Sequence, residues 1–382
     1  MVGDGPGSAG DPGATPPRGS GTRWTPVEIL PPLVLLAAGG TLVARGGGLW
    51  FDELFTAQVS RLPLAEILRA GVRGQATVPY LDGIPPSYNL PYYLVTHLWL
   101  RLTGTGSDAS LRLFTLLAAA VGVALLVRAV ARVAGTPVGV LAGVAVAVNP
   151  LVVDQSVQAR PYGLVLLATG AAALGLARWL DGARGGWALL AVAGAGMGLA
   201  HWYAAPAFAG LVTAGVVLRP HRWRALLGAG VVAAAPVTAL VAMNLLNGNG
   251  SRNAGHVLDT GGALPLLAVR AWAGGAVPLL VVTVALAAVA LLRSPRAAVL
   301  GAAWVAVPLL APRLSGDLVL APDDAPPGAE RVWLVRNVHR GVVYPTDDDA
   351  LLAADGLRLV EEVRFAASTT TLAVQRWERW ER

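Results

Sequence analysis

The chain has 382 residues, of which 55% are hydrophobic and only 14% are charged. Its mean hydropathy of +0.58 excludes an ordinary soluble domain of this size, and its long apolar runs, almost free of charge, predict a polytopic helical membrane protein. The formal charge of +6 does not indicate nucleic-acid binding, because the arginines stand at the ends of apolar runs, and the lack of cysteine excludes disulfides and thiolate chemistry.

The N-terminal segment, residues 1–25, consists mainly of Gly, Pro, Ser and Asp. Such a composition cannot bury enough apolar surface to fold. No signal-peptide cleavage site with small residues follows it, so we expect a disordered cytoplasmic tail and an uncleaved first helix.

Five groups of arginines border the ends of apolar runs, and the positive-inside rule favours placing all of them in the cytoplasm. The groups are Arg18/Arg23, Arg128/Arg132, Arg178/Arg184, Arg219/Arg222/Arg224 and Arg293/Arg296. This arrangement predicts about nine transmembrane helices, over residues 27–45, 109–131, 137–153, 161–179, 186–200, 203–218, 225–244, 276–292 and 297–312. The protein would then be a multi-pass plasma-membrane protein with a cytoplasmic N-terminus.

The remaining segments define the expected domains. Residues 26–313 form the transmembrane domain, in which 46–108 is a long first outer loop with juxtamembrane helices. The segment 88–102 is about 15 residues long and carries His97 and Arg101, so it is interpreted as a juxtamembrane or re-entrant helix. The polar segment 314–382, with short strand-like stretches at Asp317 and Arg331, predicts a small extracytoplasmic α/β domain.

The most informative motif is Asp52-Glu53, directly after Trp50-Phe51 and close to the end of the first apolar run. Carboxylates at a bilayer surface are costly, and Asp52 could act as a general base or help to hold a divalent cation. Its alternative role is to cap a helix that starts at Leu54. A third acid, Asp82, stands among Pro85, Pro86 and several tyrosines suited to an interfacial belt or to stacking on a sugar.

Three basic residues are candidates for binding a phosphate. Arg160 lies in the outer turn 154–160, where the positive-inside rule disfavours it, although a snorkelling anchor would also explain it. His201, before Trp202-Tyr203, could bind a metal or a phosphate or be a satisfied interfacial histidine. Arg252 belongs to a polar outer loop that is suited to act as a lid.

Four patches, in this order, resemble the membrane-embedded C-type (GT-C) glycosyltransferases of the protein O-mannosyltransferase and aminoarabinose transferase kind, especially the bacterial Rgt-like branch. They are Trp50-Phe-Asp-Glu, Asp82-x-x-Pro-Pro-x-Tyr with Gly104 and Leu111-Arg112 downstream, Gln158-Ala-Arg-Pro-Tyr, and His201-Trp-Tyr. The resemblance covers roughly residues 27–260. It departs from the family at Ile84, where histidine is common, and in lacking further helices with an Arg-Tyr pair after Pro308.

The resemblance implies an inverting enzyme that transfers a sugar from a polyprenyl-phosphate donor to a glycan, lipid or protein acceptor. Its catalytic residues would be Asp52, Glu53 and Asp82. Arg160, His201 and Arg252 would bind the donor phosphate, while Tyr88, Tyr162 and Tyr203 would contact substrate. A divalent cation is a candidate cofactor, without an assigned ligand set.

Two other functions stay open at this stage. A catalytically degenerate relative could act as a binding or assembly subunit, because the Arg-Tyr helices of the family are missing. A lipid or sugar transporter would instead carry charges deep within its helices and broken helices in paired halves, whereas the polar residues here gather at one face.

Overall fold

The computed structural model describes most of the first 247 residues and parts of the C-terminal region. The described residues are 24–46, 49, 51–73, 89–247, 288, 294, 296, 299, 331–339, 342–343, 353, 357–366 and 371–379. They are mostly helical. Four helices are long and apolar enough to cross a membrane, and a fifth is added if one bent pair of helices counts as a single span.

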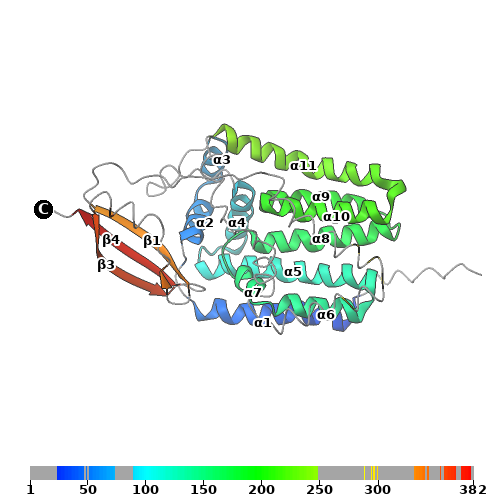
Figure 1. Ribbon diagram of the computed structural model, residues 1–382, viewed down its shortest axis with the longest axis horizontal. Coiled ribbons are helices and arrows are strands. Elements are labelled where there is room, and N and C mark those ends of the chain that lie inside the picture. The colour runs from blue at the N-terminus through cyan, green and yellow to red at the C-terminus, as the bar shows by residue number, and fades with distance from the viewer. Residues whose placement is uncertain are drawn as a thin grey trace, which may run out of the picture.

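The long helices lie side by side in a bundle, and three shorter helices, α2, α3 and α4, lie at one of its ends (Figure 1). The helices are η1 Pro26–Ile29, α1 Leu30–Arg45, α2 Phe51–Arg61, α3 Leu64–Arg73, α4 Leu90–Thr103, α5 Asp108–Ala134, α6 Thr136–Ala147, α7 Pro150–Ser156, α8 Tyr162–Leu180, α9 Gly186–Ala200, η4 Trp202–Ala204, α10 Ala205–Leu218, η5 Pro220–Arg222 and α11 Trp223–Leu246.

Each of the first seven predicted spans contains a helix. The segments meeting the length and composition of a span are η1 with α1, α5, α8 and η5 with α11, whereas α6 and α7 are bent by 68° at the break between them. Helices α9 and α10 are apolar but shorter. The last two predicted spans lie outside the described residues except for single positions, so the expected number of about nine stays a prediction.

Local signals in the sequence explain where several helices begin and end. The side chain of Ser107 accepts a hydrogen bond from the Ser110 amide and caps α5, and Asn149 caps α7 in the same way through the Leu151 amide. Pro150 follows Asn149 as the first residue of α7, where its missing N–H is harmless. Gly104 ends α4 with φ of 65°, a left-handed conformation that favours glycine.

Helices α5 and α8 pack through glycines that let the two backbones touch. A Cβ placed on Gly170 would lie 2.2 Å from the Gly122 carbonyl oxygen, and one on Gly163 would lie 2.2 Å from the Thr115 carbonyl oxygen. Close approach of this kind is the usual way for apolar helices to gain van der Waals contact where lipid competes for apolar surface. The interface therefore depends on these positions remaining glycine.

Ion pairs join the helices at the end of the bundle opposite to α2. Arg128 of α5 donates through Nη1 to both carboxylate oxygens of Glu28, at 2.8 and 2.9 Å, and its guanidinium lies 5.6 Å from the centre of the Trp24 ring. Glu28 is fully buried. Arg132 pairs with Asp181 at 3.1 Å, which connects α5 with the residue after α8.

The C-terminal region contains a four-stranded antiparallel sheet in the order β2-β1-β4-β3. Its strands are β1 Arg331–His339, β2 Val342–Val343, β3 Leu357–Ala366 and β4 Thr371–Arg379. The strand expected at Arg331 is confirmed, whereas the one expected at Asp317 lies outside the described residues. The extent and the α/β character of the domain 314–382 stay predictions.

Substituting Gly170 by Ala should destabilise the bundle, because the new methyl group would meet the backbone of α5. We expect a loss of about 1–3 kcal/mol, the usual effect of overpacking. The matched control is Gly230→Ala in α11, where nothing lies within 4 Å of the added Cβ. That variant should gain about 0.5–1 kcal/mol from helix propensity. Thermal unfolding in detergent measures both, and equal effects would contradict the packing argument.

Candidate functional site

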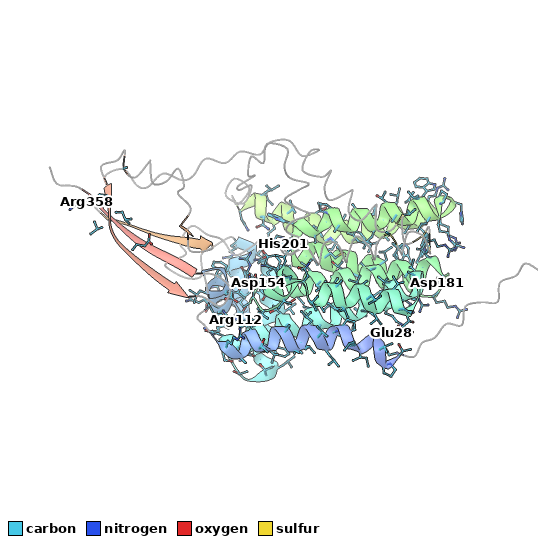
Figure 2. All side chains as sticks on the ribbon, turned by 60° about the horizontal axis from the view of Figure 1, so that its bottom comes forward. Glu28, Arg112, Asp154, Asp181, His201 and Arg358 are labelled. Atoms are coloured by element: carbon cyan, nitrogen blue, oxygen red, sulfur yellow. The ribbon has the colours of Figure 1, made fainter. Side chains whose placement is uncertain are left out.

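The candidate site lies at the end of the bundle that carries Arg112, Asp154 and His201, which we call the Arg112 end. Figure 2 shows these three labelled residues close to one end of the helices, while Glu28 and Asp181 lie at the other. The residues come from α5, from α7 and from the turn after α9. Segments distant in sequence thus meet at one end of the bundle.

Asp52 and Glu53 lie in the first turn of α2. This helix begins at Phe51, three residues before the expected start at Leu54, so the two acids are part of the helix and do not precede it as a cap. The backbone of Asp52 is described but its side chain is not. Glu53 is fully described and has no exposed surface.

The carboxylate of Glu53 forms a buried two-point ion pair with Arg112 of α5. Arg112 donates through Nε to Oε1 at 3.0 Å and through Nη2 to Oε2 at 2.7 Å. Only 2% of Arg112 is exposed. Two parallel hydrogen bonds fix the orientation of both groups as well as their distance, and they compensate the cost of burying two charges.

Glu53 also binds the turn that leads to Arg160. The Ala159 amide donates to Glu53 Oε1 at 2.7 Å. Asp52 precedes Glu53 and Arg160 follows Ala159 in the chain, so this bond joins the first turn of α2, which contains Asp52, to the turn that contains Arg160. Two residues that the sequence singled out separately thus belong to segments that are in contact.

Arg160, Tyr162 and His201 form a stack beside this junction. The Arg160 guanidinium carbon lies 5.5 Å from the centre of the Tyr162 ring, and its Nη2 donates to the Tyr162 hydroxyl at 3.3 Å. The Tyr162 ring stacks on the His201 imidazole with centroids 5.7 Å apart and an angle of 21° between the planes. A cation on an aromatic face is held by the ring quadrupole, which orients the guanidinium.

Burial shapes the protonation of the two basic groups in the stack. Desolvation lowers the pKa of Arg160 from its ordinary value. The guanidinium stays charged, because arginine is not deprotonated in proteins. Burial, and then the nearby charge of Arg160, lower the pKa of His201 to about 4. At neutral pH the stack therefore holds one fixed positive charge beside a neutral imidazole.

A carboxylate that sequence reasoning left unassigned belongs to α7, the helix just before the turn that carries Arg160. Asp154 of α7 accepts hydrogen bonds through Oδ2 from the side-chain amides of Gln155 and Gln158, each at 3.0 Å. Carboxylate and carboxamide groups are suited to bind the hydroxyls of a sugar. The signal was present in the sequence, since Asp154 stands in the same polar turn as Arg160.

The four remaining predicted site positions are not fully within the described residues. Asp82, Tyr88 and Arg252 lie outside the described residues, as does the side chain of Tyr203. Within the described part of the chain, no three His, Asp or Glu side chains converge in a way that could hold a metal ion.

Comparisons of the chain with known proteins identified no related protein. No family model, no curated protein and no solved structure matches this chain.

Replacing Glu53 by Gln should destabilise the protein strongly, because Arg112 would keep its buried charge without a compensating carboxylate. We expect a loss of about 3–5 kcal/mol, measured by thermal unfolding in detergent. The control is Asp108→Asn, which breaks the exposed pair with Arg61 and should cost at most about 1 kcal/mol. Similar losses in the two variants would show that the buried pair has no special importance.

His201 should remain neutral well below neutral pH. Selective ¹⁵N-histidine labelling should reveal one signal, absent in His201→Gln, that titrates near pH 4 rather than near 6.5. The unfolded chain binds this proton near pH 6.5 and the folded chain only near 4, so His201 makes the protein lose stability as pH falls through that window. The His201→Gln variant should lack this part of the pH dependence, and titration of His201 above pH 6 would contradict the effect of burial.

Proposed function

We propose that the protein is an inverting glycosyltransferase that moves a sugar from a polyprenyl-phosphate donor to an acceptor hydroxyl. One observation carries the proposal: the Ala159 amide binds Glu53, which joins the helix start that contains Asp52 to the turn that contains Arg160. A base and a phosphate-binding cation are the two groups that such a transfer needs from a protein. The proposal also draws on the four sequence patches that resemble the GT-C family.

The proposed topology has nine transmembrane helices, a cytoplasmic N-terminus and the site at the outer face. The arginines at the two ends of the bundle support this orientation. Arg128 and Arg132, with Asp181, gather at one end of the bundle, where the positive-inside rule favours the cytoplasm. Arg112 and Arg160 lie at the other end and are both buried, as expected of arginines with a role in a site.

In the proposed reaction the acceptor oxygen attacks the anomeric carbon while the bond to the donor phosphate breaks. Asp52 accepts the proton of the acceptor hydroxyl, and the phosphate leaves with the bonding electron pair. The charge of Arg160 stabilises this leaving group, and its orientation on Tyr162 suits two-point binding of phosphate oxygens. A single displacement of this kind inverts the anomeric configuration.

The other predicted residues take supporting roles in this proposal. Glu53 is a positioning residue, because its carboxylate is occupied by Arg112 and the Ala159 amide. Neutral His201 can donate one hydrogen bond to the phosphate, and Arg252 can approach it from the outer loop. Asp154, with its two glutamine partners, is a candidate to bind sugar hydroxyls. In this proposal the charge of Arg160 stabilises the leaving phosphate. A divalent cation as cofactor is an expectation that comes from the resemblance alone.

The central test combines a substrate screen with a point variant. Purified protein is incubated with radiolabelled polyprenyl-phosphate sugars, and label is followed into acceptors. Asp52→Asn should abolish transfer, because an amide cannot accept the acceptor proton. The control Asp181→Asn makes the same change at the opposite end of the bundle and should leave transfer unchanged. Full transfer by Asp52→Asn would reject the assignment of the base.

Other outcomes of the same experiment separate the alternative functions. Binding of a labelled donor without turnover would identify a degenerate subunit. Movement of labelled substrate across vesicles without any covalent product would identify a transporter.

A further inference from the structure

Helix α3 presents three distinct sectors around its axis. Ile67, Ala70 and Gly71 are buried against the protein. Leu64, Leu68 and Val72, spaced four residues apart, form a second row and are 49%, 40% and 55% exposed. The third sector contains the charged residues Glu66, Arg69 and Arg73 and is also exposed.

This arrangement fits a helix that has protein on one side, lipid on the second and water on the third. A surface helix of a soluble protein would need only a buried and a polar sector. An exposed apolar row next to a charged one is instead the pattern of a helix lying in the plane of a membrane interface. With ten residues, α3 is too short to cross a bilayer.

A separate contact places α3 at the level where a candidate span ends. Asn247, directly after α11, donates through Nδ2 to the carbonyl oxygens of Gly71 and Val72, at 3.3 and 3.2 Å. Helix α11 belongs to a segment long and apolar enough to cross a membrane, and Leu246 at its end is 87% exposed. The last turn of α3 is thus fixed to the point where α11 would leave the hydrocarbon core.

The charge on α3 indicates which lipids it meets. Arg69 and Arg73 outnumber Glu66, which gives the charged row a net charge of +1. Neither arginine forms an ion pair with a described residue, whereas the neighbouring Arg61 is engaged with Asp108. Arginines beside a lipid-facing apolar row lie at headgroup depth, where they attract anionic headgroups.

We propose that α3 is an interfacial helix whose Leu64-Leu68-Val72 row enters the lipid and whose Arg69 and Arg73 bind the headgroups of anionic phospholipids. The inference rests on exposure, spacing and the Asn247 contact, and it is independent of the proposed glycosyl transfer. It gives the protein a local preference for acidic lipid at the Arg112 end of the bundle, close to the candidate site.

The absence of cysteine makes the test direct. A Leu68→Cys variant is labelled with a fluorophore and reconstituted in vesicles of phosphatidylcholine with a minority of phosphatidylglycerol. Two samples are compared: in one the phosphatidylcholine carries brominated acyl chains, which quench the fluorophore, and in the other the phosphatidylglycerol carries them. Per lipid molecule, brominated phosphatidylglycerol should quench the fluorophore more than brominated phosphatidylcholine does. One net positive charge should enrich phosphatidylglycerol around α3 roughly fivefold. High salt should reduce this preference.

Two further variants test the residues named. The double variant Arg69→Gln with Arg73→Gln should remove the preference, while Arg222→Gln with Arg224→Gln, at the opposite end of α11, should retain it. A label at Glu66→Cys should be quenched by an aqueous quencher and only weakly by brominated acyl chains. Equal quenching of Leu68→Cys by the two brominated lipids, or weak quenching by both, would overturn the proposal without bearing on catalysis.

Discussion

The carboxylate of Glu53 is the constraint on which the candidate site depends. A fully buried charge is tolerated only where nearby donors compensate it, and here the donors come from α5 and from the turn before α8. Both elements must therefore lie against the start of α2 to satisfy Glu53. The same contacts that stabilise the charge therefore fix the start of α2, and with it Asp52, against the turn that carries Arg160.

A second buried acid joins the segment before α1 to α5 in the same way. Arg128 pairs with Glu28 before α1, and Arg112 pairs with Glu53 after it. The two arginines are 16 residues apart on α5, about 24 Å along a helix, and α1 itself has 16 residues. The first helix is thus clamped at both ends to α5.

Sequence patterns predicted helices in the first seven spans, all within the described residues, because apolar runs and arginine positions are local signals. They did not predict pairings, because Glu53 and Arg112 are 59 residues apart and nothing local marks them as partners. One available signal was missed. Arg160 was selected as a candidate because the positive-inside rule disfavours arginine at the outer face. The same argument applies to Arg112, which lies at the outer end of its predicted span. Asn149-Pro150 likewise signalled the break between α6 and α7, which the prediction treated as one span.

The stack of Arg160, Tyr162 and His201 has a property that its separate residues lack. Burial and the charge of Arg160 both oppose protonation of His201. The stack therefore carries one positive charge, although it has two basic side chains. An anion bound to Arg160 would offset the positive charge of Arg160 that His201 experiences, and it would thereby raise the pKa of His201. Proton binding and anion binding would then favour each other, by the reciprocity that governs any two linked ligands. In the proposed reaction the charge on the phosphate grows as its bond to the sugar breaks, so the hydrogen bond from His201 would strengthen as the leaving group forms.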